Sequence, residues 1–120
     1  MTNSNVQIIR DFIESVWNKK EYENIPNFIS SNYQANHLRR PETSFSGVEG
    51  VLKNSQYFHQ KHPNYNIKIE DSFSFEDKVA SRLLIFDTSG NSSKTIRELI
   101  IHRIENNLIA EAWSLGSDLD

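Results

Sequence analysis

The sequence contains no cysteine, and this absence excludes disulfides, thiol nucleophiles and thiolate metal ligands. The sequence also has no excess of basic residues. It contains 13 Lys and Arg and 16 Asp and Glu, which gives a formal net charge of -3. Nucleic-acid binding proteins usually carry a basic stripe. Arg39 and Arg40, which precede Pro41, are better explained by a surface loop. We therefore expect no nucleic-acid partner.

No stretch is apolar for long enough to span a membrane, and residues 1–5 have no basic segment leading into an apolar one. These two absences favour a cytoplasmic protein without a membrane partner. Internal repeats, low-complexity tracts and linkers are missing as well. The 120 residues match the common size of one domain, so we expect a single domain over residues 1–120.

Three stretches have apolar residues at helical spacing. They cover residues 5–19, 25–30 and 46–62. Ser4 with Gln7, and Ser46 with Glu49, have the spacing of capping boxes at the starts of the first and third helices. Pro63 disfavours helical backbone in the residue before it, so the third helix should end near residue 62.

The rest of the chain alternates between apolar and polar residues, as strands do. Strands are expected at residues 33–38, 65–69, 79–86, 95–104 and 108–115. Turns fall at Glu76-Asp77 and at Asn106-Asn107, where asparagine tolerates a positive φ. Helices followed by an antiparallel meander predict an α+β fold, with the helices on one face of the sheet.

This order, with particular residues inside it, resembles the SnoaL-like polyketide cyclase family of the NTF2-like superfamily. The matching stretches are residues 12–18, 47–50, 62–65, 76–80 and 104–113, together with Tyr33 and His37. The resemblance implies a cone-shaped fold, in which a curved sheet and three helices enclose a pocket for a small, apolar molecule. It implies no cofactor.

The family commonly carries a catalytic aspartate four residues after its final tryptophan. Here that position is Ser117, and Asp118 comes one residue later. A β-bulge at Leu115-Gly116 would turn Asp118 toward the pocket as a general base. Without a bulge, Asp118 belongs to a solvated C-terminus.

A two-residue turn at Asn106-Asn107 predicts the register of the last hairpin. It places His102 opposite Glu111, Ile100 opposite Trp113 and Glu98 opposite Leu115. Glu98, His102 and Trp113 would then share the pocket face. His102 with Glu111 is either an acid–base pair or an ordinary cross-strand polar pair.

Other candidates come from the first strand and the helices. His37 shares a face with Tyr33, which the resemblance places on the pocket; there His37 either acts on a carbonyl or forms part of the wall. Trp17 and Phe58 either contact the substrate or belong to the helix core. His59 and His62 are one helical turn apart, but no third residue has metal-ligand spacing, so we expect no metal.

Two functions of different classes fit these features. One is a cofactor-independent cyclase, isomerase or dehydratase, which moves a proton beside a carbonyl of an apolar substrate. The other is a non-catalytic, dimeric module that binds an apolar metabolite. The register also gives the opposite sheet face a small apolar centre, so we expect a homodimer with Leu99, Ile101, Ala110 and Ala112 near the contact.

Overall fold

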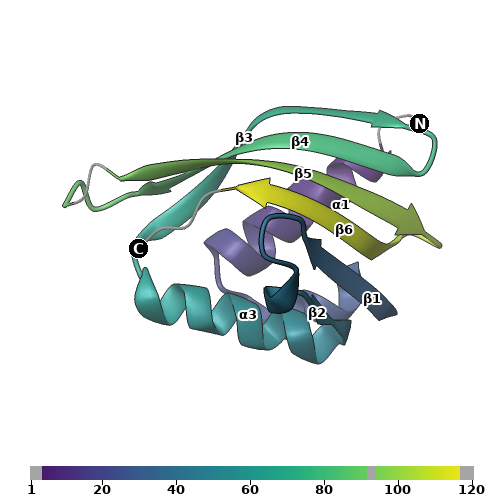
Figure 1. The fold of residues 1–120 in the computed structure, drawn as a ribbon, viewed down its shortest axis with the longest axis horizontal. Coiled ribbons are helices and arrows are strands. Elements are labelled where there is room, and N and C mark those ends of the chain that lie inside the picture. Colours follow the sequence, from purple (N-terminus) through teal and green to yellow (C-terminus); the bar gives the residue numbers. More distant parts are fainter. Residues whose placement is uncertain (1–3, 92–93, 117–120) are drawn as a thin grey trace.

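The computed structural model describes residues 4–91 and 94–116. Three helices precede the last four strands, as expected (Figure 1). They are α1 (Ser4–Phe12), which continues as a π-helical segment (Ile13–Asn18), α2 (Ile25–Phe28) and α3 (Gly47–Lys61). Helix α2 is shorter than predicted because Ile29 already has extended backbone and begins a strand. None of the described helices has the length and apolar character that a membrane span requires.

The helix ends are only partly as predicted. Helix α3 stops before Pro63, and the N–H of His62 donates to the carbonyl of Phe58 at 2.8 Å. Ser46 is the residue before α3, but its side chain makes no capping hydrogen bond, so the predicted capping box with Glu49 is wrong. In α1, the side-chain amide of Gln7 donates to Asp11 at 2.8 Å, one turn further along the helix.

Six strands form one sheet in the order β2-β1-β6-β5-β4-β3. They are β1 (Ile29–His37), β2 (Phe45–Ser46), β3 (Tyr65–Phe75), β4 (Lys78–Asp87), β5 (Thr95–Glu105) and β6 (Leu108–Gly116). Strands β3 to β6 form the predicted antiparallel meander. Strand β1 pairs in parallel with β6, with Ala35 beside Ala112 and His37 beside Ser114. The sheet is therefore mixed, and the antiparallel prediction holds only in part.

The turn between β5 and β6 is the predicted one. Asn106 and Asn107 have φ values of 54° and 64°, and Glu105 faces Leu108 across the turn. The pairing shifts by one residue soon afterwards, because Ile104 faces Ile109 while Arg103 faces Glu111. Ala110 is thus the extra residue of a β-bulge, and it exchanges the two faces of all that follows in β6.

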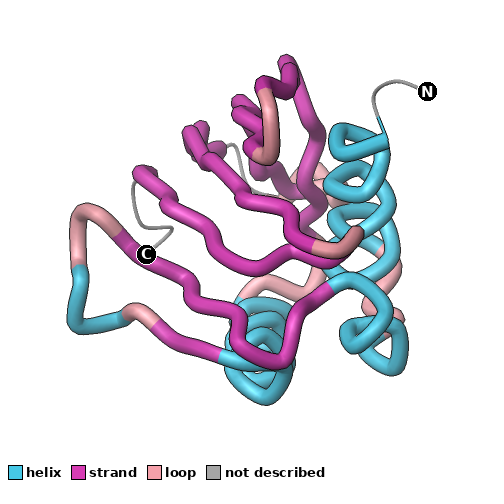
Figure 2. The backbone as a smooth tube through the Cα atoms, turned by 90° about the vertical axis from the view of Figure 1, so that its right-hand side faces the viewer, coloured by secondary structure: helices cyan, strands magenta, loops and turns pink. Residues whose placement is uncertain are grey.

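The sheet curves, and the long helices pack on its concave side (Figure 2). The apolar stripe of the first helix supplies Ile9, Phe12 and Val16, which are almost fully buried. They belong to one core cluster with residues from the facing strands, among them Val79 and Leu83. Burial of this kind is what holds an amphipathic helix to a sheet.

Candidate functional site

A cavity of about 510 Å³ lies within this fold and is mostly apolar. Its apolar wall includes Phe12, Ile13, Trp17, Val51, Phe58, Ile67, Leu83, Ile85, Ile96 and Ile100. The wall draws on the first helix, α3 and all of the long strands, so only the complete fold creates it. A volume of this size is typical of sites for small molecules.

Six of the eight site residues proposed from the sequence line this one cavity. They are Trp17, Tyr33, His37, Phe58, Glu98 and His102. Tyr33 and His37 come from the same face of β1, and Glu98 and His102 from the same face of β5, because side chains alternate along a strand. Trp17 and Phe58 meet edge to face, with ring centroids 5.7 Å apart, and contribute both to the wall and to the packing between helices.

Trp113 does not line the cavity, so its predicted place is wrong. It pairs with Ile101, whose side chain is exposed on the outer face of the sheet. The cause is the bulge at Ala110, which shifts β6 by one residue relative to β5. Ala112 and Ser114 face the cavity instead.

Asp118 lies outside the described residues. The bulge that would have turned it inward, at Leu115-Gly116, is absent, because Leu115 and Gly116 pair regularly with Leu99 and Glu98. The expectation for Asp118 also assumed that Trp113 points into the pocket. In the structure, Trp113 lies on the opposite face of the sheet.

Glu98 is the only Asp or Glu among the described residues that line the cavity. No hydrogen bond or ion pair joins its carboxyl to another described residue. Burial without a partner disfavours the carboxylate, and it raises the pKa of Glu98 from 4.5 to about 7. Near neutral pH a large share of Glu98 therefore keeps its proton and can donate a hydrogen bond.

Tyr33 is a second hydroxyl donor in the cavity. Its side chain is buried, and burial raises its pKa well above the ordinary value, with a further contribution from the charge of Glu98. Tyr33 and Glu98 thus line the same cavity as two acids, of which Tyr33 keeps its proton at neutral pH and Glu98 keeps it in a large share of the molecules.

His102 is the most deeply buried imidazole of the site, with 3% of its surface exposed. Its Nδ1 is buried and has no hydrogen-bond partner among the described residues. Burial lowers the pKa of His102 to about 4, so its ring is neutral at pH 7. Across the strands it faces Ala112, not Glu111, so the predicted His102–Glu111 pair is wrong.

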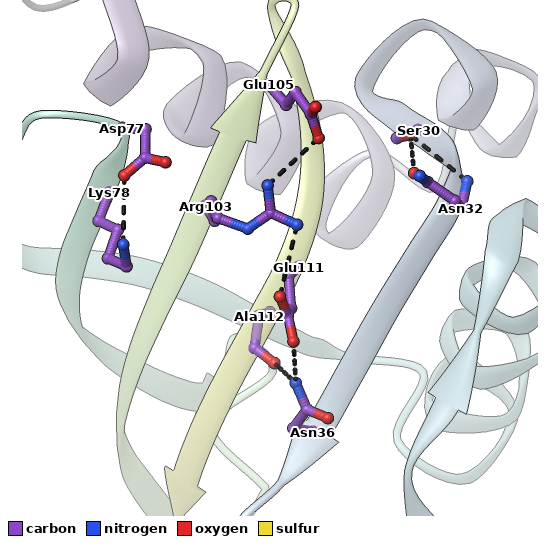
Figure 3. A network of polar contacts seen from close by, with 9 residues as sticks. All are labelled: Ser30, Asn32, Asn36, Asp77, Lys78, Arg103, Glu105, Glu111 and Ala112. Carbon is purple, nitrogen blue, oxygen red and sulfur yellow. Dashed lines mark hydrogen bonds and ion pairs between the residues drawn. The ribbon is translucent and has the colours of Figure 1, made fainter.

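Glu111 belongs to a polar network on the outer face of the sheet (Figure 3). Arg103 donates to Glu111 at 3.4 Å and to Glu105 at 3.2 Å. The side-chain amide of Asn36 donates to Glu111 at 3.1 Å and to the carbonyl of Ala112 at 3.0 Å. This network links β1, β6 and β5 and has no contact with His102.

His37 is half-buried at the end of β1 and lines the cavity. Its Nδ1 lies 2.6 Å from Oγ1 of Thr43. Its ring also meets the edge of Phe45, at 5.5 Å between centroids. Burial lowers the pKa of His37, so it too is neutral near pH 7.

His59 has a structural role. Its Nε2 lies 2.7 Å from the carbonyl oxygen of Trp17, which can only accept, so Nε2 carries the proton. Its Nδ1 therefore accepts from the hydroxyl of Tyr22 at 2.6 Å. Both nitrogens are thus engaged, and they tie α3 to the end of the first helix. No group of three or more His, Cys, Asp or Glu in the described ranges could hold a metal ion.

Several polar residues of the cavity wall were not predicted from the sequence. Arg40, Thr43, Asn54 and Lys61 line the cavity together with His62. The sequence places Arg40 in a surface loop and does not predict that it lines the cavity. For Arg40 and Thr43, one signal in the sequence was available. Residues 38–44 directly follow the strand that carries Tyr33 and His37, so side chains of this loop could be expected near the same cavity.

A mixed, curved sheet that folds with its helices around an apolar cavity defines the NTF2-like class of α+β proteins. A sequence model of the SnoaL-like polyketide cyclases matches residues 7–119. The chain belongs to the SnoaL-like polyketide cyclase family.

Solved structures agree with this assignment of the fold. A candidate polyketide cyclase from Bacillus cereus is 26% identical, with a TM-score of 0.81 over 95% of this chain and 74% of that one. IdmH from Streptomyces antibioticus, also a candidate polyketide cyclase, is 18% identical, with a TM-score of 0.81 over 94% and 91%. A candidate ketosteroid isomerase from Kribbella flavida is 10% identical, with a TM-score of 0.78 over 99% and 82%. A comparison with curated proteins finds no match to this chain.

Proposed function

We propose that this protein is a cofactor-independent enzyme of the cyclase or isomerase type, which moves a proton on a carbon next to a carbonyl group of a small, apolar substrate. The observation that carries the proposal is Glu98, a carboxyl that lies in a mostly apolar cavity, has no hydrogen-bond or ion-pair partner among the described residues and has a pKa of about 7. Perturbed acids inside cavities are typical of sites that transfer protons. The family membership supports the same class of reaction.

The roles follow from the protonation states. The substrate carbonyl oxygen accepts hydrogen bonds from protonated Glu98 and from the hydroxyl of Tyr33. A neutral histidine of the cavity takes a proton from the adjacent carbon, and the electrons of that C–H bond move onto the carbonyl oxygen, which gives an enolate. The two donors stabilise the negative charge of the enolate, and hydrogen bonds of this kind are stronger in a mostly apolar cavity than in water. The histidinium then returns the proton to carbon or to the rearranged product.

Exchange of hydrogen for deuterium at the carbon next to a ketone tests this proposal without knowledge of the natural substrate. We would incubate the full chain with a panel of apolar cyclic ketones and 1,3-diketones in D₂O and follow exchange by NMR. Glu98→Gln should slow enzyme-dependent exchange by about tenfold or more, because an amide is a much weaker acid. Glu105→Gln is the matched control, since Glu105 is exposed on the same strand.

Two outcomes would contradict the proposal. Exchange that is equally fast in wild type and Glu98→Gln would remove the role of Glu98. Saturable binding of these ketones without any exchange would instead favour the alternative of a non-catalytic binding module.

We also propose that two copies of the chain associate through the outer face of the sheet. Trp113, Ile101, Ala80 and Phe73 lie in one row across β6, β5, β4 and β3. Leu99 and Leu115 form the next row, and they are 58% and 48% exposed. Ala110 and Ala112, which were expected at the contact, are buried and drop out of it.

The charges around these rows suit a second copy of the same surface. Arg97 and Arg82 pair with Glu70 at one side, and Arg103 pairs with Glu105 and Glu111 at the other. These three arginines and three glutamates are neutral in sum within one copy, so two such faces meet without strong like-charge repulsion. Isologous contacts of this kind are the commonest in homodimers.

A further inference from the structure

The loop after β1 turns back on the last residue of that strand. The backbone N–H of His37 donates to Oγ of Ser44 at 3.0 Å, and Nδ1 of His37 lies 2.6 Å from Oγ1 of Thr43. Between them, Pro41–Thr43 forms a short 3₁₀ turn in which the N–H of Thr43 donates to the carbonyl of Arg40 at 2.9 Å. Three hydrogen bonds therefore hold Thr43 beside the imidazole.

The hydroxyl of Thr43 determines which nitrogen of His37 carries the proton. Oγ1 of Thr43 also donates to the carbonyl oxygen of Arg40 at 2.8 Å. A hydroxyl has one proton, and a carbonyl oxygen can only accept, so the proton of Thr43 is used in that bond. The short contact with His37 is then a hydrogen bond only if Nδ1–H is the donor. In the neutral ring, Nε2 keeps its lone pair.

His37 differs in this respect from His59 and His102, the two buried histidines. In His59 both nitrogens are engaged by Trp17 and Tyr22, so that ring has no free lone pair. In His102, Nδ1 has no partner among the described residues, and nothing there selects one tautomer. The ring of His62, which also lines the cavity, has no hydrogen bond to another described residue that would select a tautomer. Among the cavity histidines, His37 is therefore the one whose described neighbours leave a single, defined acceptor nitrogen.

We propose that Thr43 is a positioning residue, which holds His37 in its Nδ1–H tautomer so that Nε2 serves as the base. This inference rests on the proposed function. In the step concerned, Nε2 takes the proton from the carbon beside the substrate carbonyl and the C–H electrons pass to the oxygen. The positive charge that forms on the ring is shared with Oγ1 of Thr43 through the Nδ1–H bond, as in other oriented imidazoles.

The direct test is ¹⁵N NMR of the histidine rings in the full chain, at about pH 8, where histidine with an ordinary or lowered pKa is neutral. In wild type, His37 should have a protonated Nδ1 and an unprotonated Nε2. Thr43→Val removes the acceptor, and the proton should move to Nε2, as in a free imidazole. Thr43→Ser keeps the hydroxyl and should keep the wild-type signals. Thr88→Val is the matched control, since Thr88 is exposed and, among the described residues, its hydroxyl and its N–H donate to the carbonyl of Asn64.

Ketone exchange supplies the second measurement. Thr43→Val should lower the exchange rate by about tenfold or more, and Thr43→Ser should restore most of it. Wild-type signals of His37 in Thr43→Val would overturn the proposal, and so would an altered tautomer with an unchanged exchange rate. If the wild type exchanges no ketone at all, the proposed function fails, while the NMR signals of the two variants still decide whether Thr43 sets the tautomer.

Discussion

Glu98 on β5 lies directly opposite Gly116 on β6, and its Cγ is 3.1 Å from the point where a Cβ on Gly116 would stand. The carboxyl with the raised pKa therefore owes its position partly to a missing side chain. Any Cβ at residue 116 would push the Glu98 side chain by a few tenths of an ångström.

Gly116→Ala should thus slow ketone exchange while it costs little stability, under about 1 kcal/mol, because a flexible side chain can give way. Thermal unfolding and exchange rates measure the two effects. When Glu98 is already replaced by Gln, Gly116→Ala should have almost no further effect on exchange, because Gly116→Ala acts by displacing the Glu98 side chain. Additive losses in the double variant would show that Gly116 acts by another route.

The raised pKa of Glu98 makes a prediction about stability. The folded protein holds the proton up to about pH 7, whereas the unfolded chain releases it near 4.5. The contribution of Glu98 is therefore fully present below pH 4.5 and is lost as the pH rises through 7. The glutamine of Glu98→Gln does not titrate. Between pH 4.5 and 7 the free energy of unfolding of this variant, relative to that of wild type, should therefore rise by about 3 kcal/mol as the pH increases. Urea unfolding at several pH values measures the difference, and a difference independent of pH would contradict it.

The lowered pKa of His102 predicts the opposite dependence. The unfolded chain takes up the proton near pH 6.5 and the folded protein only near 4, so stability is lost as the pH falls between these values. His102→Leu should gain about 3 kcal/mol relative to wild type from pH 6.5 to 4. Because the two groups act in opposite directions between pH 4.5 and 6.5, only the single variants reveal either one. A constant difference for His102→Leu would show that the folded ring accepts a proton readily.

The two tryptophans should respond differently to a ligand. Trp17 lines the cavity, and Trp113 does not. An apolar ketone with a heavy atom, such as 4-iodoacetophenone, quenches fluorescence on contact. Trp113→Phe should keep the quenching on binding, and Trp17→Phe should lose most of it. The reverse result would place the ligand on the outer face of the sheet.

A charged substitution on the outer face of the sheet tests the proposed homodimer. Ile101→Lys places an ammonium group in the central row of apolar residues and should give the mass of a monomer in light scattering. Leu38→Lys is the control, because Leu38 is similarly exposed but follows β1 outside that row. A wild type that remains monomeric at high concentration would exclude this association.

Much of the fold could be predicted because its determinants are local. Helical spacing of apolar residues, the stop before Pro63 and the turn at Asn106-Asn107 each depend on a few neighbouring residues. Which site residues share a face on β1 and on β5 was predicted for the same reason, while the family resemblance placed the face of β1 on the pocket. Tyr33 and His37, like Glu98 and His102, share a face through simple alternation within one strand.

What the sequence by itself determined is the order of the elements, the meander and the pairs of residues that share a face within each strand. Only the tertiary structure decided which face of β6 meets the cavity, that β1 lies parallel to β6, and that Thr43 returns to His37. The bulge at Ala110 replaced Trp113 by Ala112 and Ser114 in the cavity wall, although no glycine marks it in the sequence. Local preferences set the backbone of each segment, but the register between strands follows from how the whole sheet and its helices bury their apolar side chains together.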